Sequence, residues 1–175
     1  MKIADVKIEV KLGDIANQPD ITAIVNAANA QLRIGGGVAG AIHRAAGPAL
    51  EEECRPYAPI NPGEAVITGA HKLPNKYVIH CLGPVYGLDH PESTLLANCY
   101  RNAFKLAEEH KIASIAFPAI STGAFGYPFE QATDVVVSVV NEICVDLAYL
   151  KKLRFVLYSQ SDLDVYQKKL NQLRE

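Results

Sequence analysis

Apolar and polar residues alternate near the start of the chain, where Ile3, Val6, Ile8 and Val10 stand among polar neighbours. This alternation predicts a half-buried strand at an edge of a sheet. Short apolar runs predict strands that are buried on both faces. These runs lie at residues 22–25 and 114–118, and further strands are predicted at residues 64–68, 76–81 and 153–158.

Apolar residues recur at helical spacing between these strands. A helix is predicted from Ser93, as its N-cap, to about His110. Residues 129–147 contain many β-branched valines, but their length and apolar spacing favour a helix. Further helices are predicted at residues 38–46 and 49–55 and in the C-terminal segment, where Asp162 or Asp164 is the expected N-cap.

Strands therefore alternate with helices after the first segment. This order predicts an α/β fold, a three-layer α/β/α sandwich with a mixed, mostly parallel central sheet. The length suits one domain that spans residues 1–175. In such sheets ligands bind outside the carboxyl ends of the strands, so the loops after several strands are expected to meet at one cleft.

Composition and charge narrow the classes of function. The chain has 17 Lys and Arg against 19 Asp and Glu, a formal net charge of −2, which argues against nucleic acid and an anionic membrane surface as partners. Four widely spaced cysteines, with no signal-peptide pattern and no apolar run that could span a bilayer, favour free thiols and a cytoplasmic location. No metal-ligand spacing is present, so neither a metal nor a cofactor is expected.

Two loops rich in small residues carry the candidate chemistry. Gly35, Gly36 and Gly37 follow a strand that ends with Asn26 and Asn29, and a helix follows them. Glycine backbone can approach a ligand closely, and turned N–H groups at a helix start can bind an anion. A second loop, residues 120–128, is expected across the same cleft. A phosphate or diphosphate site is the hypothesis, and a flexible turn is its alternative.

The ordered motifs resemble the macro domain family. They are Asn26-Ala-Ala-Asn29, Gly35-Gly-Gly-Val38-Ala-Gly-Ala-Ile42-His43, Ile79-His80 with Gly83-Pro84, and Pro118-Ala-Ile-Ser121-Thr-Gly-Ala-Phe125-Gly-Tyr-Pro128. Gly13-Asp14-Ile15 and Val156-Leu157-Tyr158 fit the same family, so the resemblance covers essentially the whole chain. Macro domains bind ADP-ribose, and many remove ADP-ribose from modified proteins or deacetylate O-acetyl-ADP-ribose. The resemblance therefore implies these molecules, and ADP-ribosylated proteins, as partners.

The resemblance also implies roles for individual residues. Asp14, with the Ile15 backbone beside it, would accept a hydrogen bond from the adenine amino group, and Tyr158 would lie against the ring. Asn29 would hydrogen-bond the distal ribose, whereas Asn26 and His43 would be structural. The diphosphate and distal ribose would be enclosed by the two loops, through Gly36, Gly37, Val38 and Ala39 on one side and Ser121, Thr122, Gly123, Ala124 and Phe125 on the other.

Ala39 is a departure from the pattern of many hydrolytic members, which carry Asp at this position. Alanine cannot act as an acid or a base. Other members, including coronavirus macro domains, resemble the Gly-Gly-Gly-Val-Ala-Gly run and still hydrolyse mono-ADP-ribosyl esters. Two functions therefore remain open from the sequence: a hydrolase in which Asn29 is central to catalysis, and a reader module that binds ADP-ribose without turnover.

Overall fold

The computed structural model describes residues 1–174 and contains one mixed seven-stranded sheet with five α-helices. The strand order is β1-β2-β7-β6-β3-β5-β4, and the contacts from β2 through β5 in this order are parallel. The strands are β1 (Lys2–Ile3), β2 (Val6–Leu12), β3 (Ala23–Ala27), β4 (Ala65–Gly69), β5 (Tyr77–Cys81), β6 (Ser114–Phe117) and β7 (Lys152–Leu157). This confirms the predicted fold class.

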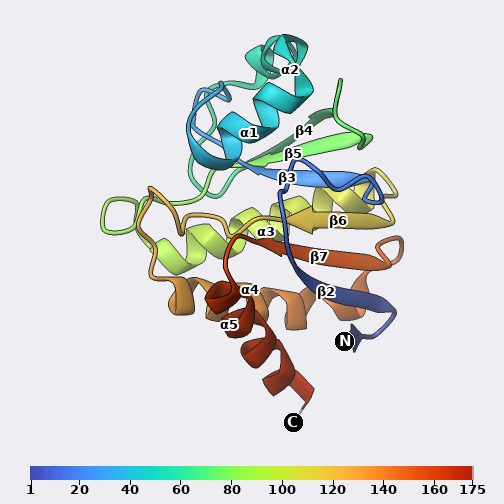
Figure 1. The fold of residues 1–175 in the computed structure, drawn as a ribbon. Helices are drawn as coiled ribbons and strands as arrows, with labels where there is room; N and C mark the ends of the chain where they lie inside the picture. Colours follow the sequence, from blue (N-terminus) through green and yellow to red (C-terminus); the bar gives the residue numbers. More distant parts are fainter. Residues whose placement is uncertain (175) are drawn as a thin grey trace.

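Helices cover both faces of the sheet (Figure 1). They are α1 (Gly37–Ala46), α2 (Pro48–Cys54), α3 (Glu92–Glu109), α4 (Phe129–Ile143) and α5 (Gln160–Asn171), with 3₁₀ turns η1 (Arg55–Tyr57), η2 (Cys144–Asp146) and η3 (Gln172–Arg174). One apolar core lies under α3, α4 and α5, and a smaller core lies under α1 and α2. None of the helices within residues 1–174 has both the length and the apolar character that crossing a bilayer requires.

The first predicted strand is wrong in its position within the sheet. Residues 4 and 5 form a tight turn, with Ala4 at φ 49°, and the turn lets β1 pair antiparallel with β2. The two-residue β1 is therefore the edge strand, and β2 lies between β1 and β7. Alternation of apolar and polar residues indicates only that one face of a strand is open to solvent. This is also true of β2, so the pattern could not distinguish an edge strand from an inner strand with one open face.

Two predicted helix caps are also wrong. Pro91 is the N-cap of α3, because its carbonyl accepts the first helical hydrogen bond from the Leu95 N–H at 3.0 Å, and Ser93 already lies inside the helix. Ser159 is the N-cap of α5: its backbone is extended, and its hydroxyl accepts from the Asp162 N–H at 3.2 Å. Both Asp162 and Asp164 are therefore helical residues rather than caps.

Residues 129–147 were predicted as one helix, and α4 confirms a helix despite its β-branched residues. The α-helix ends earlier than predicted, at Ile143, and continues only as the turn η2. The reason lies outside the segment. The Glu108 carboxylate, at the end of α3, accepts hydrogen bonds of 3.0–3.1 Å from the N–H groups of residues 148–150, which holds this backbone away from a helical path.

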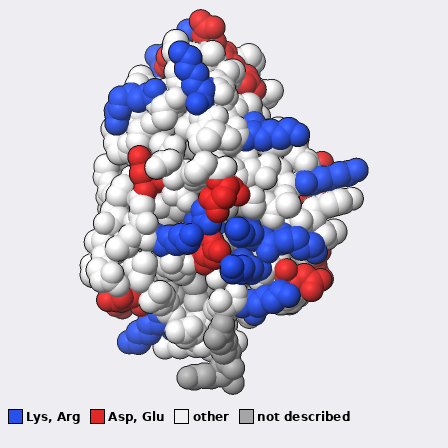
Figure 2. All heavy atoms as spheres, turned by 45° about the vertical axis from the view of Figure 1, so that its right-hand side comes forward, with Lys and Arg blue, Asp and Glu red and all other residues white. Residues whose placement is uncertain are grey.

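The open face of β2 and β7 carries charged side chains instead of a helix. Parallel register places Lys7 beside Lys152 and Glu9 beside Arg154. Figure 2 shows Lys and Arg gathered on one face of the molecule, with Asp and Glu among them. Arg154 is only 3% exposed, because the segment between β2 and β3 folds over it. Charge pairing with Arg154 therefore holds this segment on the sheet together with the apolar packing of the buried Ile15 and Ile21.

Candidate functional site

A cleft of about 590 Å³ lies where the parallel strands end. The segments after β3, β5, β6 and β7 line it, and Figure 1 shows these loops together at the left edge of the sheet. Neighbouring strands are about 4.8 Å apart, so the cleft runs along the sheet edge across several of them. The lining residues are Ala27, Ala28, Asn29, Gly35, Gly36, Gly37, Val38, Ala39, Gly83, Ala119, Ile120, Ser121, Thr122, Gly123, Ala124, Phe125, Phe129, Val156, Leu157, Tyr158 and Asp162.

The glycine-rich side of the cleft ends in the start of α1. Gly36 is the N-cap, with φ −83° and ψ 177°, and Gly37 has φ 54°, a left-handed conformation that costs glycine little. No acidic residue lies in the first turn of α1. The positive end of the helix and its free N–H groups therefore face the cleft, and no carboxylate in the first turn neutralises them. This arrangement suits an anionic ligand.

The opposite side of the cleft is a loop held by its own hydrogen bonds. The Tyr127 N–H donates to the Ser121 carbonyl at 2.9 Å, the Gly126 N–H donates to the Gly123 carbonyl at 3.0 Å, and the Thr122 hydroxyl donates to the Ala119 carbonyl at 2.9 Å. Ser121 is buried, has φ 67°, and its hydroxyl has no hydrogen-bond partner among the described residues. The loop thus presents a fixed backbone to the cleft.

Asn29 stands between β3 and the glycines. Its side-chain Nδ2 donates to the Arg33 carbonyl at 2.8 Å, and its Oδ1 accepts from the Arg33 N–H at 3.0 Å. These two bonds fix the side chain at the cleft wall. An amide has a second N–H and a second lone pair, so Asn29 keeps one donor and one acceptor for a ligand.

A buried polar network supports the strand that leads to Asn29. The Asn26 Nδ2 donates to the His80 Nδ1 at 3.1 Å, and the His80 Nε2 lies 2.9 Å from the Thr68 hydroxyl, which donates to the Gly69 carbonyl. These contacts require a neutral His80 with its proton on Nε2. Both Asn26 and His80 are fully buried, so Asn26 holds β3 to β5 rather than facing the cleft, as expected.

The comparisons with known proteins agree with this geometry. Residues 25–136 match the model of the family described as "Macro domain". A macro domain-containing protein of Chlorobaculum tepidum, CT2219, is 54% identical over 151 residues, which cover 86% of this chain and 88% of the relative. The chain belongs to the macro domain family.

Two further similarities concern proteins whose names mention a ligand or an activity. The O-acetyl-ADP-ribose deacetylase of Salmonella typhimurium is 47% identical to this macro domain over 171 residues, which cover 95% of each chain. A solved structure of an Oceanobacillus iheyensis macrodomain mutant with ADPR is 38% identical, with a TM-score of 0.93, and the match covers 99% of this chain and 97% of that one.

The structure of this macro domain brings together all the predicted site residues except two. Asp14 and Ile15 are not part of the cleft lining. Ile15 is 1% exposed and packs in the core under α1 and α2, while an Asp14 oxygen accepts from the Ala16 N–H at 2.9 Å. Asp14 nevertheless lies near Tyr158 along the backbone, because the Gly13 N–H donates to the Leu157 carbonyl at 3.1 Å. The roles of all these residues stay predictions.

Several lining residues of this macro domain were not predicted. Gly83 follows β5 and touches the opposite loop so closely that an added Cβ would lie 2.1 Å from the Ser121 Oγ. The Gly83-Pro84 pair after a strand was the available signal. Phe129 carries no pattern that separates it from core residues, and Val156 and Leu157 were recognised only as part of the Val156-Leu157-Tyr158 motif. Asp162 was interpreted only as a helix cap, although its position after the last strand could have indicated the cleft.

We searched residues 1–174 for side chains that could hold a metal ion and for reactive thiols. No group of three His, Cys, Asp or Glu side chains there is arranged to hold a metal ion. All four cysteines are free and buried. Burial raises the pKa of the Cys54 thiol to about 12, which keeps it protonated and poorly nucleophilic.

The buried His80 predicts a pH dependence of stability. Burial lowers the pKa of His80 to about 3, below its ordinary 6.5. Between these two pH values the ring is protonated in the unfolded chain and neutral in the folded chain. The free energy of unfolding is therefore not reduced by this group above pH 6.5. It decreases by up to about 1.4 kcal/mol per pH unit as the pH falls from 6.5 towards 3. We expect His80→Gln to reduce this slope in denaturant unfolding measured at several pH values.

The matched control for this prediction is His110→Gln, at an exposed position. This variant should keep the slope of the unchanged protein. Equal slopes for the His80→Gln variant and the unchanged protein would contradict the assignment of this acid sensitivity to the buried ring.

Proposed function

We propose that this macro domain binds ADP-ribose in the cleft and hydrolyses its esters, with O-acetyl-ADP-ribose and mono-ADP-ribosylated proteins as substrates. One observation carries the proposal. The cleft has the size of a nucleotide, and it lies between two loops of small residues that expose their backbone and the N-terminus of α1, which has no acidic residue in its first turn. No Lys, Arg or His lies among its described lining residues, so a bound diphosphate must be held by N–H groups. The named relatives support the same ligand.

The order of strands suggests how ADP-ribose lies in the cleft. Tyr158 follows β7 at one end, the loop after β6 comes next, and Asn29 with the glycines follows β3. Tyr158 is 69% exposed, so its ring is available to stack on adenine. The diphosphate then lies between the loop after β6 and the start of α1, and the distal ribose lies beside Asn29 and Phe125. Asp14 belongs to the same end, because the backbone of Gly13 is hydrogen-bonded to that of Leu157.

Hydrolysis in this arrangement needs a water placed by the protein and the substrate. Water oxygen attacks the carbonyl carbon of the ester, the bond between that carbon and the ribose oxygen breaks, and the ribose oxygen takes the proton. Asn29 has a free donor and acceptor to orient the ribose and the water. Ala39 provides only backbone and space, so no side-chain base acts there.

Asn29 is therefore the residue on which turnover should depend. We expect Asn29→Ala to lower kcat on O-acetyl-ADP-ribose by at least about tenfold, or about 1.4 kcal/mol of transition-state stabilisation. Release of free ADP-ribose, followed by chromatography, measures this rate. Turnover that is unchanged in the folded variant would reject the mechanism and leave the activity standing.

A loosened loop is the competing explanation for such a loss, because Asn29 also holds Arg33. Comparing kcat with ADP-ribose affinity in Asn29→Ala separates the two explanations. A loosened loop should weaken ADP-ribose binding about as much as it lowers kcat, because the neighbouring glycines line the same cleft. Loss of the amide that orients the water should lower kcat by a larger factor than it lowers ADP-ribose affinity.

The proposal as a whole is tested in two steps. Calorimetry should show ADP-ribose binding of about micromolar affinity, on the order of −8 kcal/mol, and much weaker binding of AMP, which lacks the second phosphate and the distal ribose. Incubation with O-acetyl-ADP-ribose and with a protein carrying mono-ADP-ribose on a carboxylate should then release ADP-ribose. Equal affinities for AMP and ADP-ribose would reject the site.

The second candidate function is a reader that binds ADP-ribose without turnover. Ala39 favours it, because the cleft has no carboxylate at the glycine-rich end that could deprotonate water. The same two assays separate the functions. Micromolar binding with release of ADP-ribose no faster than in buffer would establish the reader and exclude the hydrolase.

A further inference from the structure

Asp162 is the one charged side chain among the described residues that line the cleft. It lies in the first turn of α5, partly buried. Its carboxylate forms no ion pair with, and accepts no hydrogen bond from, any side chain or backbone group that the structure describes in residues 1–173. An unpaired negative charge in a cleft suited to a diphosphate requires an explanation, because it opposes the binding of anions nearby.

Helix capping does not provide that explanation. Ser159 and Asp162 have the spacing of a capping box, in which the third helical residue returns a hydrogen bond to the backbone of the N-cap. Only half of the box is made here: the Ser159 hydroxyl accepts from the Asp162 N–H at 3.2 Å. No bond from the Ser159 N–H to the Asp162 carboxylate is present in the described part of the chain. Asp162 lines the cleft, and its carboxylate has no hydrogen-bond partner within the helix start.

The position of Asp162 along the cleft is set by the sheet. Tyr158 and Asp162 follow β7, while the glycines and α1 follow β3, and β6 lies between these strands. Two strand spacings separate the two ends, roughly 10 Å. If ADP-ribose binds as proposed above, on which this inference rests, the carboxylate lies at the adenosine end and away from the diphosphate.

We propose that Asp162 is a specificity residue that binds the hydroxyl groups of the adenosine ribose and excludes nucleotides phosphorylated on that ribose. A carboxylate accepts hydrogen bonds from hydroxyl donors, and acidic residues have this task at the ribose of dinucleotides. A phosphate at the same place adds about two negative charges next to Asp162. With no cation in the lining to offset them, the repulsion selects ADP-ribose over ADP-ribose 2′-phosphate.

Calorimetry with these two nucleotides tests the proposal on the unchanged protein and on Asp162→Asn, which keeps the shape and removes the charge. We expect the unchanged protein to bind ADP-ribose at least about tenfold more tightly than ADP-ribose 2′-phosphate, and Asp162→Asn to reduce this ratio to about threefold or less. About 0.5 M salt should also reduce the ratio in the unchanged protein, because the repulsion is screened.

Asp164→Asn is the matched control. Asp164 lies on the same helix, is exposed, accepts from the Gln160 amide at 2.8 Å, and does not line the cleft. This variant should keep the ratio of the unchanged protein. The specificity role would be overturned if the unchanged protein bound the two nucleotides with affinities that differ by less than twofold. It would also be overturned if Asp162→Asn kept the whole preference for ADP-ribose. In both cases ADP-ribose itself would still bind. Absent ADP-ribose binding in the unchanged protein would instead reject the proposed function, and this inference with it.

Discussion

Gly40→Ala should destabilise the protein and weaken ADP-ribose binding by at least about tenfold, although Gly40 does not line the cleft. Helix propensity alone predicts the opposite, because alanine in a helix interior is favoured over glycine by roughly 1 kcal/mol. A Cβ at Gly40, however, would lie 2.3 Å from the Gly35 carbonyl oxygen and 2.8 Å from the Arg44 guanidinium. The backbone of Gly35 cannot rotate away as a side chain can, so the glycine-rich loop must move.

The expected loss of stability is about 2 kcal/mol, as for overpacking of a tight contact, measured by denaturant unfolding. Ala45→Gly is the control: it weakens the same helix at an exposed position by roughly 1 kcal/mol without touching the loop. The control should bind ADP-ribose normally. Normal binding by Gly40→Ala would show that the glycine-rich loop does not hold the ligand.

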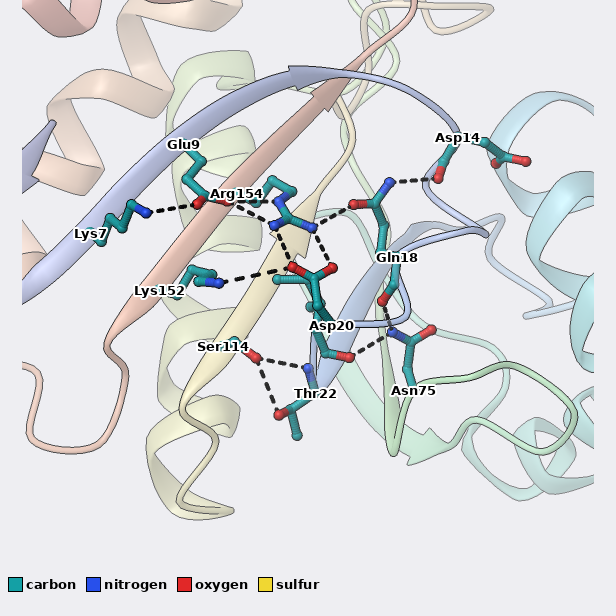
Figure 3. Close-up of polar contacts among 11 residues, drawn as sticks. Lys7, Glu9, Asp14, Gln18, Asp20, Thr22, Asn75, Ser114, Lys152 and Arg154 are labelled. Carbon is teal, nitrogen blue, oxygen red and sulfur yellow. Dashed lines mark hydrogen bonds and ion pairs between the residues drawn. The ribbon is translucent and has the colours of Figure 1, made fainter.

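Arg154→Met should cost about 3 kcal/mol of stability, the order expected when a buried ion pair loses one partner. The Arg154 guanidinium donates to both Asp20 oxygens at 2.7–2.8 Å and to Glu9 and Gln18 at 2.9 Å (Figure 3). Asp20 is about half exposed and regains water when the pair is broken, so the cost should fall at the lower end of the range for buried pairs.

The effect of Arg154→Met should depend on pH. The hydrogen bond from Arg154 holds the pKa of the Asp20 carboxyl well below its ordinary 3.8, so this pair contributes stability above that pH and loses it as the pH falls. The difference between variant and unchanged protein should therefore narrow in acid. Lys152→Met is the control, since Lys152 lies 3.9 Å from Asp20 at the surface and should contribute little. Equal losses in the two variants would contradict the special role of the buried arginine.

Arg154 also connects the core to the predicted adenine end of the cleft. Gln18 accepts from Arg154 and donates to the Asp14 carbonyl at 2.8 Å (Figure 3). Removal of the arginine should therefore loosen the segment that carries Asp14. Weaker ADP-ribose binding by folded Arg154→Met, without a comparable loss in Lys152→Met, is the expected result in calorimetry.

Local signals in the sequence determined the fold class and most of the cleft. Helical and strand periodicities reflect which face of each element is buried, so they placed β3, β6, β7, α3 and α4 to within a few residues, except at the end of α4. Gly35–Gly37 and residues 121–125 were identified as the cleft walls, because the backbone of small residues next to strand ends can approach a ligand closely.

Only the tertiary structure decided the features that depend on distant contacts. The position of β2 between β1 and β7 and the end of α4 at Ile143 depend on contacts with distant segments that no local pattern contains. Asp162 shows the physical reason. As an acidic residue in the first turn of a helix it has an ordinary sequence explanation, and its free carboxylate acquires meaning only because the sheet places it beside Tyr158 in a cleft without cations.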